Sequence, residues 1–405
     1  MIIEPAKSVS GELRAPPSKS YTHRVLFLGL LCDGTTTFEN PSKCDDTRYT
    51  LEVIKRFGAE CDWEKIESDG KVKKADIYAG ESGTTARIAL GIASLADGKC
   101  TINGEEGLRK RPMKPLLKAL KQLDVKTRSR DGKLPIEIEG RPSGDEVEIS
   151  GQVSSQFITA LMYVGGRIGL DIKVTDELVS EPYVDMTIEV LQRSGLKIER
   201  EDDIFHVEGN MKAKHFSIPG DYSSAAFFLA AGALFGDVTV KNLPKESVQA
   251  DSKIIDLLKR FGADVSTKKD NIRIVKNELQ RIVCNCNDFP DLFPILSVMG
   301  VHAEGETVLT GEQLRYKESD RIGNMAKNLK KMGADVEELK DGLIVRKSRL
   351  KGAELDPRGD HRIAMALSIA ALGAEGKSEI RQPGCVGKSY PDFFEDLEEV
   401  IDHGR

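Results

Sequence analysis

The sequence has 405 residues, with 59 Lys and Arg against 65 Asp and Glu, which gives a formal net charge of −6 at pH 7. A chain of this length is too long for a single core and predicts two domains of roughly 200 residues. Hydrophobic residues make up 40% and charged residues 31%, as is typical of soluble globular proteins. The acidic balance argues against a nucleic-acid binder, because such a protein presents a basic face.

The sequence also bears on location and metals. No stretch approaches the roughly 18 consecutive apolar residues of a transmembrane helix, and residues 1–5 lack the basic and apolar regions of a signal peptide. Among seven scattered cysteines only Cys284 and Cys286 lie close together, and a single Cys-x-Cys pair is weak evidence for a metal. The six histidines show no metal-ligand spacing. We expect a cytoplasmic protein without a metal, a cofactor or disulfides.

The first predicted helix follows two prolines. The stretch reads Pro16-Pro17-Ser18-Lys19-Ser20-Tyr21-Thr22-His23-Arg24 and continues into an apolar run over residues 25–31. Because proline cannot continue a helix and Ser is a good N-cap, a helix should begin at Lys19. The backbone N–H groups and the positive end of the helix dipole then meet Lys19, Ser20 and Arg24, which favours an anion site. For this stretch alone, a surface helix with solvated Lys and Arg is the alternative.

Five further segments repeat this arrangement of a Ser or Asp cap, about three apolar turns, a glycine and a short β-branched strand. The six segments begin at Ser18, Ser82, Ser154, Ser223, Asp291 and Asp360, at separations of 64 to 72 residues. A more amphipathic helix follows each segment and usually ends at a glycine, the residue expected after a helix. These second helices are predicted over residues 51–57, 116–123, 187–194, 254–261, 325–332 and 393–401.

The repeats predict an α/β protein of two similar domains with three repeats each. Each repeat holds two helices with their strands, which indicates a β/α block rather than a solenoid repeat. The breaker sequence Ser217-Ile218-Pro219-Gly220 separates the halves. The opening strand, residues 2–3 and 11–13, fits neither triplet, and we expect it to complete the second domain. The predicted domains are 15–218, and 1–14 with 219–405, joined by a hinge in which the chain crosses twice.

The repeat starts and nearby loops share a chemistry. Lys, Arg, Ser, Thr and Gln gather there in an otherwise acidic protein. Guanidinium and ammonium groups match phosphate and carboxylate, so these positions favour a small polyanion, and the hydroxyl and amide groups of residues 154–156 suit a polyhydroxylated ligand. Simpler interpretations stay open for single residues. These are a surface salt bridge for Glu318 with Arg321, an N-cap for Asp291, a tie between a helix and a loop for Arg87, and solvation for Lys110.

Eight motifs together resemble the enolpyruvyl transferase family over the whole chain, and most closely its members that act on shikimate 3-phosphate. The motifs are Pro-Ser-Lys-Ser with Arg24, Gly-Glu-Ser-Gly-Thr-Thr-Ala-Arg (80–87), Arg-Lys-Arg-Pro (109–112), Ser-Ser-Gln-Phe-Ile-Thr-Ala-Leu (154–161), Leu-Val-Ser-Glu-Pro-Tyr-Val-Asp (178–185), Lys-Glu-Ser-Asp-Arg (317–321), Asp-His-Arg-Ile-Ala-Met-Ala (360–366) and Lys-Ser-Tyr-Pro-Asp (388–392).

The resemblance implies a fold and a reaction. The fold is two hinged domains of three βαβαββ repeats each, an inside-out α/β barrel, in a monomer that closes on its substrates. The reaction is an addition–elimination that transfers the enolpyruvyl group of phosphoenolpyruvate to the 5-hydroxyl of shikimate 3-phosphate and releases phosphate. This is the sixth step of the shikimate pathway to chorismate and the aromatic amino acids. Neither a metal nor an organic cofactor is implied, and the partners are the two substrates, without nucleic acid or membrane.

The resemblance also assigns residues by matched position. Shikimate 3-phosphate should be bound by Lys19, Ser20, Arg24, Ser154, Ser155, Gln156, Ser180, Asp291, Gln313 and Lys317. Phosphoenolpyruvate should be bound by Lys19, Gly83, Arg111, Gln156, Arg321, Arg362 and Lys388. Asp291 is the candidate base for the hydroxyl, and Glu318, assisted by Lys19, the candidate for proton transfer at the enolpyruvyl group. Which carboxylate protonates the methylene stays open.

Two departures from the family pattern and three alternatives remain. Glu81-Ser82 stands where Asn-Ala is usual, and Gln313-Leu314 where Asn-Trp is frequent. The sister enzyme that acts on UDP-N-acetylglucosamine typically has a cysteine in the loop corresponding to 104–116 and a Lys-Asn pair at the first helix, and both are missing here. A non-catalytic sensor of phosphorylated sugars would need no carboxylates among the cations. An RNA-processing cyclase would need a nucleotide site and a basic face.

Overall fold

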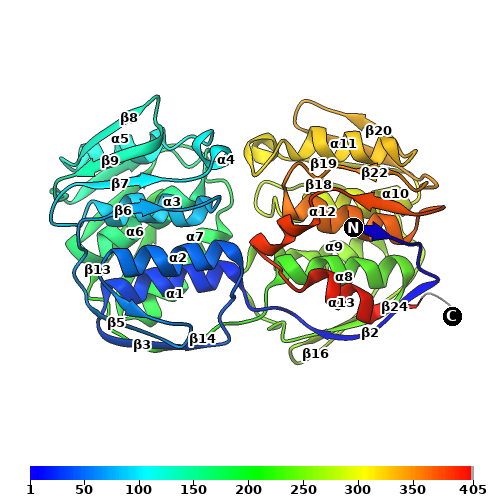
Figure 1. Cartoon of the computed structure of the whole chain (residues 1–405), viewed down its shortest axis with the longest axis horizontal. Helices are drawn as coiled ribbons and strands as arrows, with labels where there is room; N and C mark the ends of the chain where they lie inside the picture. The colour runs from blue at the N-terminus through cyan, green and yellow to red at the C-terminus, as the bar shows by residue number, and fades with distance from the viewer. Residues whose placement is uncertain (403–405) are drawn as a thin grey trace. The chain divides into compact units, whose positions relative to one another are not determined.

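The computed structural model describes residues 1–402, and the chain forms two compact units: residues 17–218, and residues 1–16 together with the chain from 219 onward (Figure 1). Each unit contains three copies of one supersecondary block. Each copy has a small sheet of its own.

The second repeat shows the block in full. Along the chain it consists of β6 (Asp76–Tyr78), α3 (Gly83–Ala93), β7 (Cys100–Asn103), the short α4 (Glu106–Arg109), α5 (Lys114–Gln122), β8 (Lys126–Arg130) and β9 (Lys133–Glu139). The strand order in the sheet is β6-β7-β9-β8. The first pair is parallel, as a crossover through a helix allows, and the other two pairs are antiparallel.

The other two repeats of residues 17–218 follow the same plan. The first has α1 (Lys19–Leu31), β3 (Asp33–Glu39), α2 (Asp45–Arg56), β4 (Glu60–Cys61), β5 (Lys65–Asp69) and, from the end of the unit, β14 (His215–Ser217), in the sheet order β14-β3-β5-β4. The third has β10 (Glu146–Ile149), α6 (Ser155–Ile168), β11 (Leu170–Val174), α7 (Pro182–Arg193), β12 (Leu196–Glu201) and β13 (Ile204–Gly209), in the order β10-β11-β13-β12.

The remaining unit holds the last three repeats. The fourth has β2 (Ser8–Arg14), α8 (Tyr222–Phe235), β15 (Gly236–Lys241), η1 (Ala250–Lys253), α9 (Ile254–Phe261), β16 (Asp264–Lys268) and β17 (Asn271–Val275), with β24 (Ile401–Asp402) added beside β2. The fifth has β18 (Val283–Asn285), α10 (Phe293–His302), β19 (Glu306–Thr310), η2 (Glu312–Tyr316), α11 (Arg321–Lys331), β20 (Asp335–Glu338) and β21 (Gly342–Arg346). The sixth has β22 (Glu354–Leu355), α12 (His361–Leu372), β23 (Ser378–Ile380), η3 (Pro383–Lys388) and α13 (Phe393–Val400), with β1 (Ile2–Ile3) beside β23.

The units exchange their opening strands. By chain order β2 precedes the first repeat, but it pairs in parallel with β15 of the fourth, with Val238 opposite Gly11. In the same way β14 precedes the fourth repeat but pairs in parallel with β3 of the first, with Phe216 opposite Phe38. This exchange explains why the chain passes between the units twice, at residues 16–17 and 218–219.

The helices lie inside and the sheets outside. In α8 every residue from Tyr222 to Leu234 except Ser223 is buried, whereas β9 buries only alternate residues. A helix that is apolar on all sides must lie in the interior, and a strand with one polar face lies at the surface. Gly91 of α3 allows the closest helix contact, since an added Cβ would come within 2.9 Å of the Ala160 backbone oxygen in α6. The predicted inside-out α/β fold is confirmed.

The predicted element boundaries are right at most starts and wrong at some. Ser18, Ser82, Ser154 and Asp360 are the N-caps of α1, α3, α6 and α12. The predicted start at Ser223 is wrong, because Asp221 caps α8 by accepting from Ser224 N at 2.8 Å. The second helix of several repeats starts earlier than predicted, α2 at Asp45 and α7 at Pro182, because an acidic or proline first turn is helical without being apolar.

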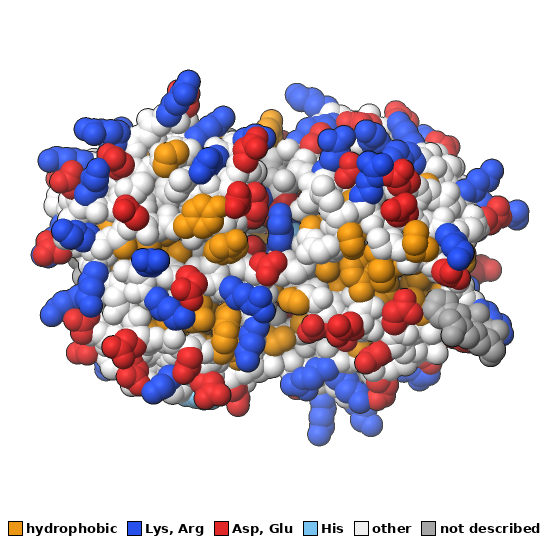
Figure 2. Space-filling view, in the orientation of Figure 1, with side chains coloured by type: hydrophobic (Ala, Val, Ile, Leu, Met, Phe, Trp, Pro, Cys, Tyr) orange, Lys and Arg blue, Asp and Glu red, His pale blue; other side chains and the backbone are white. Residues whose placement is uncertain are grey.

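The visible surface carries basic and acidic side chains side by side (Figure 2). Over residues 1–402, no helix has both the length and the apolar character needed to cross a membrane.

Candidate functional site

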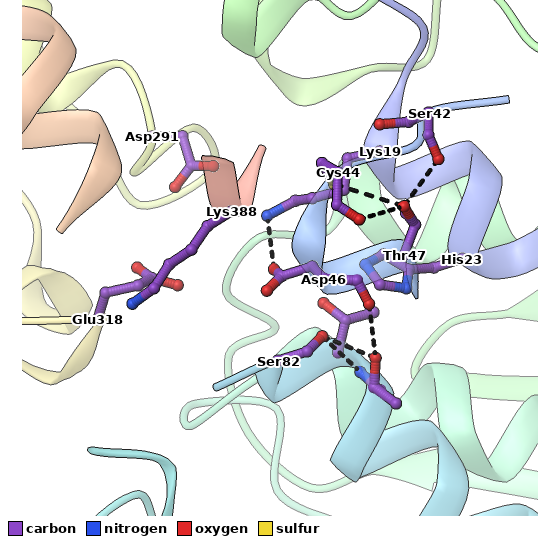
Figure 3. A network of polar contacts seen from close by, with 12 residues as sticks. Lys19, His23, Ser42, Cys44, Asp46, Thr47, Ser82, Asp291, Glu318 and Lys388 are labelled. Carbon is purple, nitrogen blue, oxygen red and sulfur yellow. Dashed lines mark hydrogen bonds and ion pairs between the residues drawn. The ribbon is translucent and has the colours of Figure 1, made fainter. Parts of the chain in front are cut away.

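The first cluster lies at the start of α1. Ser18 caps the helix, and Lys19 Nζ lies 3.0 Å from Asp46 Oδ2 (Figure 3). The two side chains are 13% and 11% exposed. Asp46 comes from the first turn of α2, where the helix dipole favours an acidic residue. The ion pair therefore fixes the Lys19 ammonium beside the N-terminus of α1.

A buried hydroxyl network supports this ion pair. His23 Nδ1 lies 2.7 Å from Thr50 Oγ1, which lies 2.7 Å from Thr85 Oγ1, and Thr85 donates to Ser82 Oγ at 2.7 Å. Burial, and then the charges of Lys19 and Arg24, hold the pKa of His23 well below its usual value. His23 is therefore a neutral link between α1 and α2, and the network joins both helices to α3.

Arg24 lies one turn into α1 and is 2% exposed. Its Nε donates to Thr187 Oγ1 at 2.9 Å, Nη1 to Ser20 O at 2.9 Å and Nη2 to Tyr183 O at 2.7 Å. Burial lowers the pKa of Arg24 from its ordinary value, which is so high that the guanidinium stays charged. Three of its N–H groups are used by the protein, so it orients α1 against α7 as well as supplying charge.

The start of α3 brings Gly83 against Arg111. A Cβ added to Gly83 would come within 2.6 Å of Arg111 Nη1. The missing side chain lets this guanidinium lie close to the N-terminus of α3. A cation and the orphan N–H groups of a helix start thus share one place, which favours an anion.

The Gln156 amide at the start of α6 is held from both sides. Arg87 Nη1 donates to Gln156 Oε1 at 2.8 Å, and Gln156 Nε2 donates to Thr84 Oγ1 at 2.9 Å. Arg87 also reaches Ser154 Oγ at 3.4 Å and lies over the Phe157 ring at 5.4 Å. Arg87 thus connects α3 to α6, and it determines which amide atom Gln156 presents on each side.

Two serines of the candidate list are nearly fully buried. Ser155 and Ser180 are each 4% exposed. Ser180 has a φ of +57°, a conformation that non-glycine residues rarely adopt. Backbone strain of this kind concentrates at functional sites and turns.

A second cluster, in the other unit, surrounds Arg321 at the start of α11. The Arg321 side chain has 0% exposure. It donates to Asp360 Oδ2 at 3.1 Å, to Pro290 O at 2.9 Å, to Asp291 Oδ1 at 2.7 Å and to Glu318 Oε2 at 2.7 Å. Four of its five N–H donors are therefore used within the protein, and the surrounding carboxylates raise its pKa well above the ordinary value despite burial.

Asp291 is held by two arginines. Arg321 binds Oδ1, and Nε and Nη2 of Arg362 both lie 3.2 Å from Oδ2. Burial alone would raise the pKa of Asp291, but Arg362 and Arg321 outweigh burial and hold it well below its usual value. The interpretation of Asp291 as an N-cap is wrong, because α10 begins two residues later, after Leu292. The carboxylate is bound to side chains instead.

Asp360 was missed by the sequence analysis as a member of this cluster. Its Oδ1 accepts from Arg362 N at 3.0 Å as the cap of α12, and its Oδ2 accepts from Arg321 and from Ser319 Oγ. The side chain has 0% exposure. One carboxylate thus sets the start of α12 and the position of the Arg321 guanidinium.

Gln313, Lys317 and Lys388 belong to the same unit. Gln313 Nε2 donates to Asn287 O, and Lys317 Nζ donates to Gln313 Oε1. Lys388 Nζ donates to Gly359 O at 3.0 Å, next to Asp360. Asp291, Glu318 and Lys388 are labelled in Figure 3.

Comparisons with known proteins place the chain in a family. The model of the family described as EPSP synthase (3-phosphoshikimate 1-carboxyvinyltransferase) matches residues 3–397. The chain belongs to the EPSP synthase family. It is 46% identical over 403 residues to the 3-phosphoshikimate 1-carboxyvinyltransferase of Thermococcus kodakarensis, covering 99% of this chain and 100% of that one. The protein of the same name from Pyrococcus abyssi is 46% identical over 405 residues, with 100% and 98% covered.

Solved structures agree with the EPSP synthase family assignment. EPSP synthase from Acinetobacter baumannii has a TM-score of 0.83 and 27% identity, with 99% of this chain and 97% of that one covered. The enolpyruvyl transferase NikO from Streptomyces tendae, at 18% identity and a TM-score of 0.79 over 98% and 96% of the chains, shares the fold. The resemblance predicted from the motifs is confirmed.

Membership of the EPSP synthase family gives the two clusters a common context. Within residues 17–218, the structure gathers Lys19, Ser20 and Arg24 at one helix start, and Gly83, Arg111, Ser154 and Gln156 around two others. Within the other unit it gathers Asp291, Glu318, Arg321 and Arg362, and joins Gln313 to Lys317. Sequence reasoning did not assign Asp46 or Asp360, and it left Arg87 off the list.

Proposed function

We propose that the chain transfers the enolpyruvyl group of phosphoenolpyruvate to the 5-hydroxyl of shikimate 3-phosphate and releases phosphate. Membership of the EPSP synthase family supports the activity. The observation that carries it at residue level is the Asp291 carboxylate bound by Arg321 and Arg362, a possible base set among fixed cations.

The cations supply the binding. Both substrates are anions, with two phosphates and two carboxylates between them, and only fixed positive charge offsets their repulsion. We assign Lys19, Ser20, Arg24, Ser154, Ser155, Gln156, Ser180, Gln313 and Lys317 to shikimate 3-phosphate, with Asp291 at its hydroxyl. Lys19, Gly83, Arg111, Gln156, Arg321, Arg362 and Lys388 are assigned to phosphoenolpyruvate. Neither list includes a metal or a cofactor.

The reaction needs two proton transfers. The 5-hydroxyl loses its proton as its oxygen bonds to the enol carbon, and the methylene of phosphoenolpyruvate gains a proton. The resulting adduct then loses phosphate and a methyl proton, which restores the double bond. Asp291 takes the hydroxyl proton, and Glu318 with Lys19 moves the proton at the carbon.

Binding of phosphoenolpyruvate would activate Asp291. While both arginines bind it, the carboxylate has a depressed pKa and is a weak base. A substrate carboxylate that competes for Arg321 and Arg362 would weaken these ion pairs, and the pKa of Asp291 would rise toward its ordinary value. The base would then be stronger only when the second substrate is present.

The proposal includes closure of the two units on the substrates about the double crossing, because the resemblance assigns residues of both units to the same pair of molecules. Closure would exclude water and strengthen each charge contact. It also includes a cytoplasmic, monomeric enzyme, as the resemblance implies. The domain limits 15–218 and 1–14 with 219–405 stay a prediction.

The test is phosphate release from phosphoenolpyruvate with shikimate 3-phosphate or UDP-N-acetylglucosamine as separate acceptors. We expect release with shikimate 3-phosphate alone. Asp291→Asn should reduce turnover by roughly 10² or more while the substrates still bind. The control is Asp237→Asn, which removes an exposed ion pair with Arg273 and should leave turnover unchanged. Tight binding of shikimate 3-phosphate without any phosphate release would contradict the proposal and favour a sensor.

A further inference from the structure

Cys284 and Cys286 form a pair that the proposed reaction does not use. Cys284 lies on β18, the edge strand of the sheet β18-β19-β21-β20, and Cys286 follows directly after it. Both are reduced, and they are 6% and 0% exposed. Their neighbour Val283 is 67% exposed. The pair is therefore covered, but it lies at a sheet edge that reaches the surface.

The two side chains contact each other and differ in character. The Cys286 thiol donates a hydrogen bond to the Cys284 sulfur. This bond, aided by the nearby Arg260, lowers the pKa of Cys284, whereas the same bond and burial raise the pKa of Cys286. Arg260 is fixed there, because its Nη2 donates to Val283 O at 2.7 Å. Cys284 is thus the partner that forms a thiolate, and Cys286 keeps its proton.

We propose that Cys284 and Cys286 are a reversible oxidation site, which hydrogen peroxide closes to an intramolecular disulfide. The Cys284 sulfur attacks a peroxide oxygen, so that an S–O bond forms, the O–O bond breaks and hydroxide leaves as water. The Cys286 sulfur then attacks Cys284, the S–S bond forms, the S–O bond breaks, and the second water leaves with the Cys286 proton. In sum, two thiols and one peroxide give one disulfide and two waters.

The disulfide would change the backbone beside it. Residues i and i+2 of an extended strand are about 6.6–6.8 Å apart between Cα atoms, the upper end of the range a disulfide spans. Closing the bridge therefore shortens the chain between Cys284 and Cys286. It pulls on the hydrogen bond from Cys286 N to Thr310 O, which is 2.7 Å long. Strained bridges of this kind are easily reduced, so the modification is reversible.

The pull would reach the candidate site through Asn287. Asn287 O accepts from Gln313 Nε2, and Asn287 Oδ1 accepts from Glu312 N at 3.0 Å. Gln313 in turn accepts from Lys317. Because Gln313 and Lys317 are assigned to shikimate 3-phosphate, this part of the inference rests on the proposed function. Oxidation should weaken the binding of shikimate 3-phosphate more than that of phosphoenolpyruvate.

The experiment follows the thiols and the kinetics separately. The full chain is treated with hydrogen peroxide, alkylated, digested with trypsin and weighed. Residues 282–315 form a single tryptic peptide, and Cys284 and Cys286 are its only cysteines. We expect this peptide to lose two hydrogens and to escape alkylation, and to become alkylatable again after a phosphine reductant. The KM for shikimate 3-phosphate should rise about two- to tenfold, the effect of one weakened hydrogen bond, and recover on reduction.

Variants separate the bridge from general oxidation. Cys286→Ser cannot form the bridge, and its KM for shikimate 3-phosphate should no longer respond to a reversible oxidant. Cys385→Ser, which removes another partly covered thiol, should respond like the unchanged chain. A peptide 282–315 that stays fully alkylatable after peroxide treatment would overturn the proposal, as would a closed bridge with an unchanged KM. If the reduced chain releases no phosphate, the proposed function fails, while the peptide mass still decides whether the bridge forms.

Discussion

Lys19 and Asp46 come from the first turns of two different helices and meet at 3.0 Å, with both side chains largely covered. An ammonium group on a long flexible stem loses much of its freedom when a carboxylate fixes it. Asp46 therefore positions the cation that is assigned to both substrates. It does not need to touch either substrate to affect the reaction.

We predict that Asp46→Asn lowers kcat/KM by about ten- to hundredfold, because the variant loses a hydrogen bond between charged groups while keeping the volume of the side chain. The fold should survive, since Ser18 still caps α1. Steady-state phosphate release measures the effect. Asp45→Asn is the matched control: Asp45 is adjacent, is 52% exposed and lies 3.9 Å from Arg48. Equal losses in both variants would mean that Asp46 acts only through the charge of the helix start.

Arg87→Lys should raise the KM for both substrates by about two- to tenfold, with little change in kcat. A lysine keeps the charge but not the fork that reaches Gln156 and Ser154, nor the flat group over Phe157. Initial rates at varied concentrations of each substrate measure the change. Arg193→Lys removes a comparable guanidinium over Phe216 at 4.9 Å and serves as the control. A loss of stability without a change in either KM would reduce Arg87 to a structural tie.

The sequence predicts what depends on neighbours in the chain. Caps such as Ser18 and Asp360 act within one turn, so the repeat starts could be found, and with them Lys19 and Arg362. At α8 a choice between two possible caps three residues apart or fewer, Asp221 and Ser223, was decided by packing that no local pattern shows.

The missed residues depend on contacts across the fold. Asp46 is 27 positions from Lys19 along the chain, and Asp360 is 39 positions from Arg321. Each looks like an ordinary acidic first turn or cap until the helices pack. The exchange of β2 and β14 between the units likewise follows from strand pairing over long separations, although the breaker at 217–220 shows where one crossing falls.

Gly83→Ala should separate binding from stability. The new methyl group would lie 2.6 Å from Arg111 Nη1, so the end of this flexible side chain must move. Alanine favours a helix over glycine by about 0.5–1 kcal/mol, so the melting temperature should hold or rise. The KM for phosphoenolpyruvate should increase about tenfold, as expected when one charged contact is displaced. Gly384→Ala, where an added Cβ meets nothing within 4 Å, is the control. An unchanged KM would remove Arg111 from the phosphoenolpyruvate site.

His302 should make stability depend on pH. Burial, and then Lys276 and Lys347, lower the pKa of His302 from 6.5 to about 4. Between these values the unfolded chain binds a proton that the folded chain does not, so stability is full above pH 6.5 and falls as the pH decreases toward 4. The loss is at most about 3 kcal/mol.

Denaturant unfolding of His302→Phe across this range isolates the effect. Phenylalanine keeps the edge contact with Phe235, which lies at 5.5 Å between ring centroids, and cannot take up the proton. The difference in unfolding free energy between the variant and the unchanged chain should therefore shift in favour of the variant as the pH falls from 6.5 to 4. The same substitution at the exposed His215 provides the control. A difference that does not change with pH would show that His302 titrates alike in both states.

Asp291 should show different pKa values in the free enzyme and in the enzyme–substrate complex. In the free chain Arg362 and Arg321 outweigh burial and hold its pKa well below the ordinary value, so kcat/KM should show no loss of this base as the pH falls to about 4. In the complex the carboxylate of phosphoenolpyruvate would compete for both arginines. The acid limb of kcat should then lie at a higher pH than that of kcat/KM.

Rates measured over pH at saturating and at low phosphoenolpyruvate give the two profiles. Arg362→Lys offers an independent check, because a lysine cannot reproduce the two contacts at 3.2 Å from Nε and Nη2 to Asp291 Oδ2. In this variant the free enzyme should already show a raised acid limb, so the two profiles should move together. If the acid limbs of kcat and kcat/KM coincide in the unchanged chain, Asp291 keeps its arginines when the substrate binds, and another group must accept the hydroxyl proton.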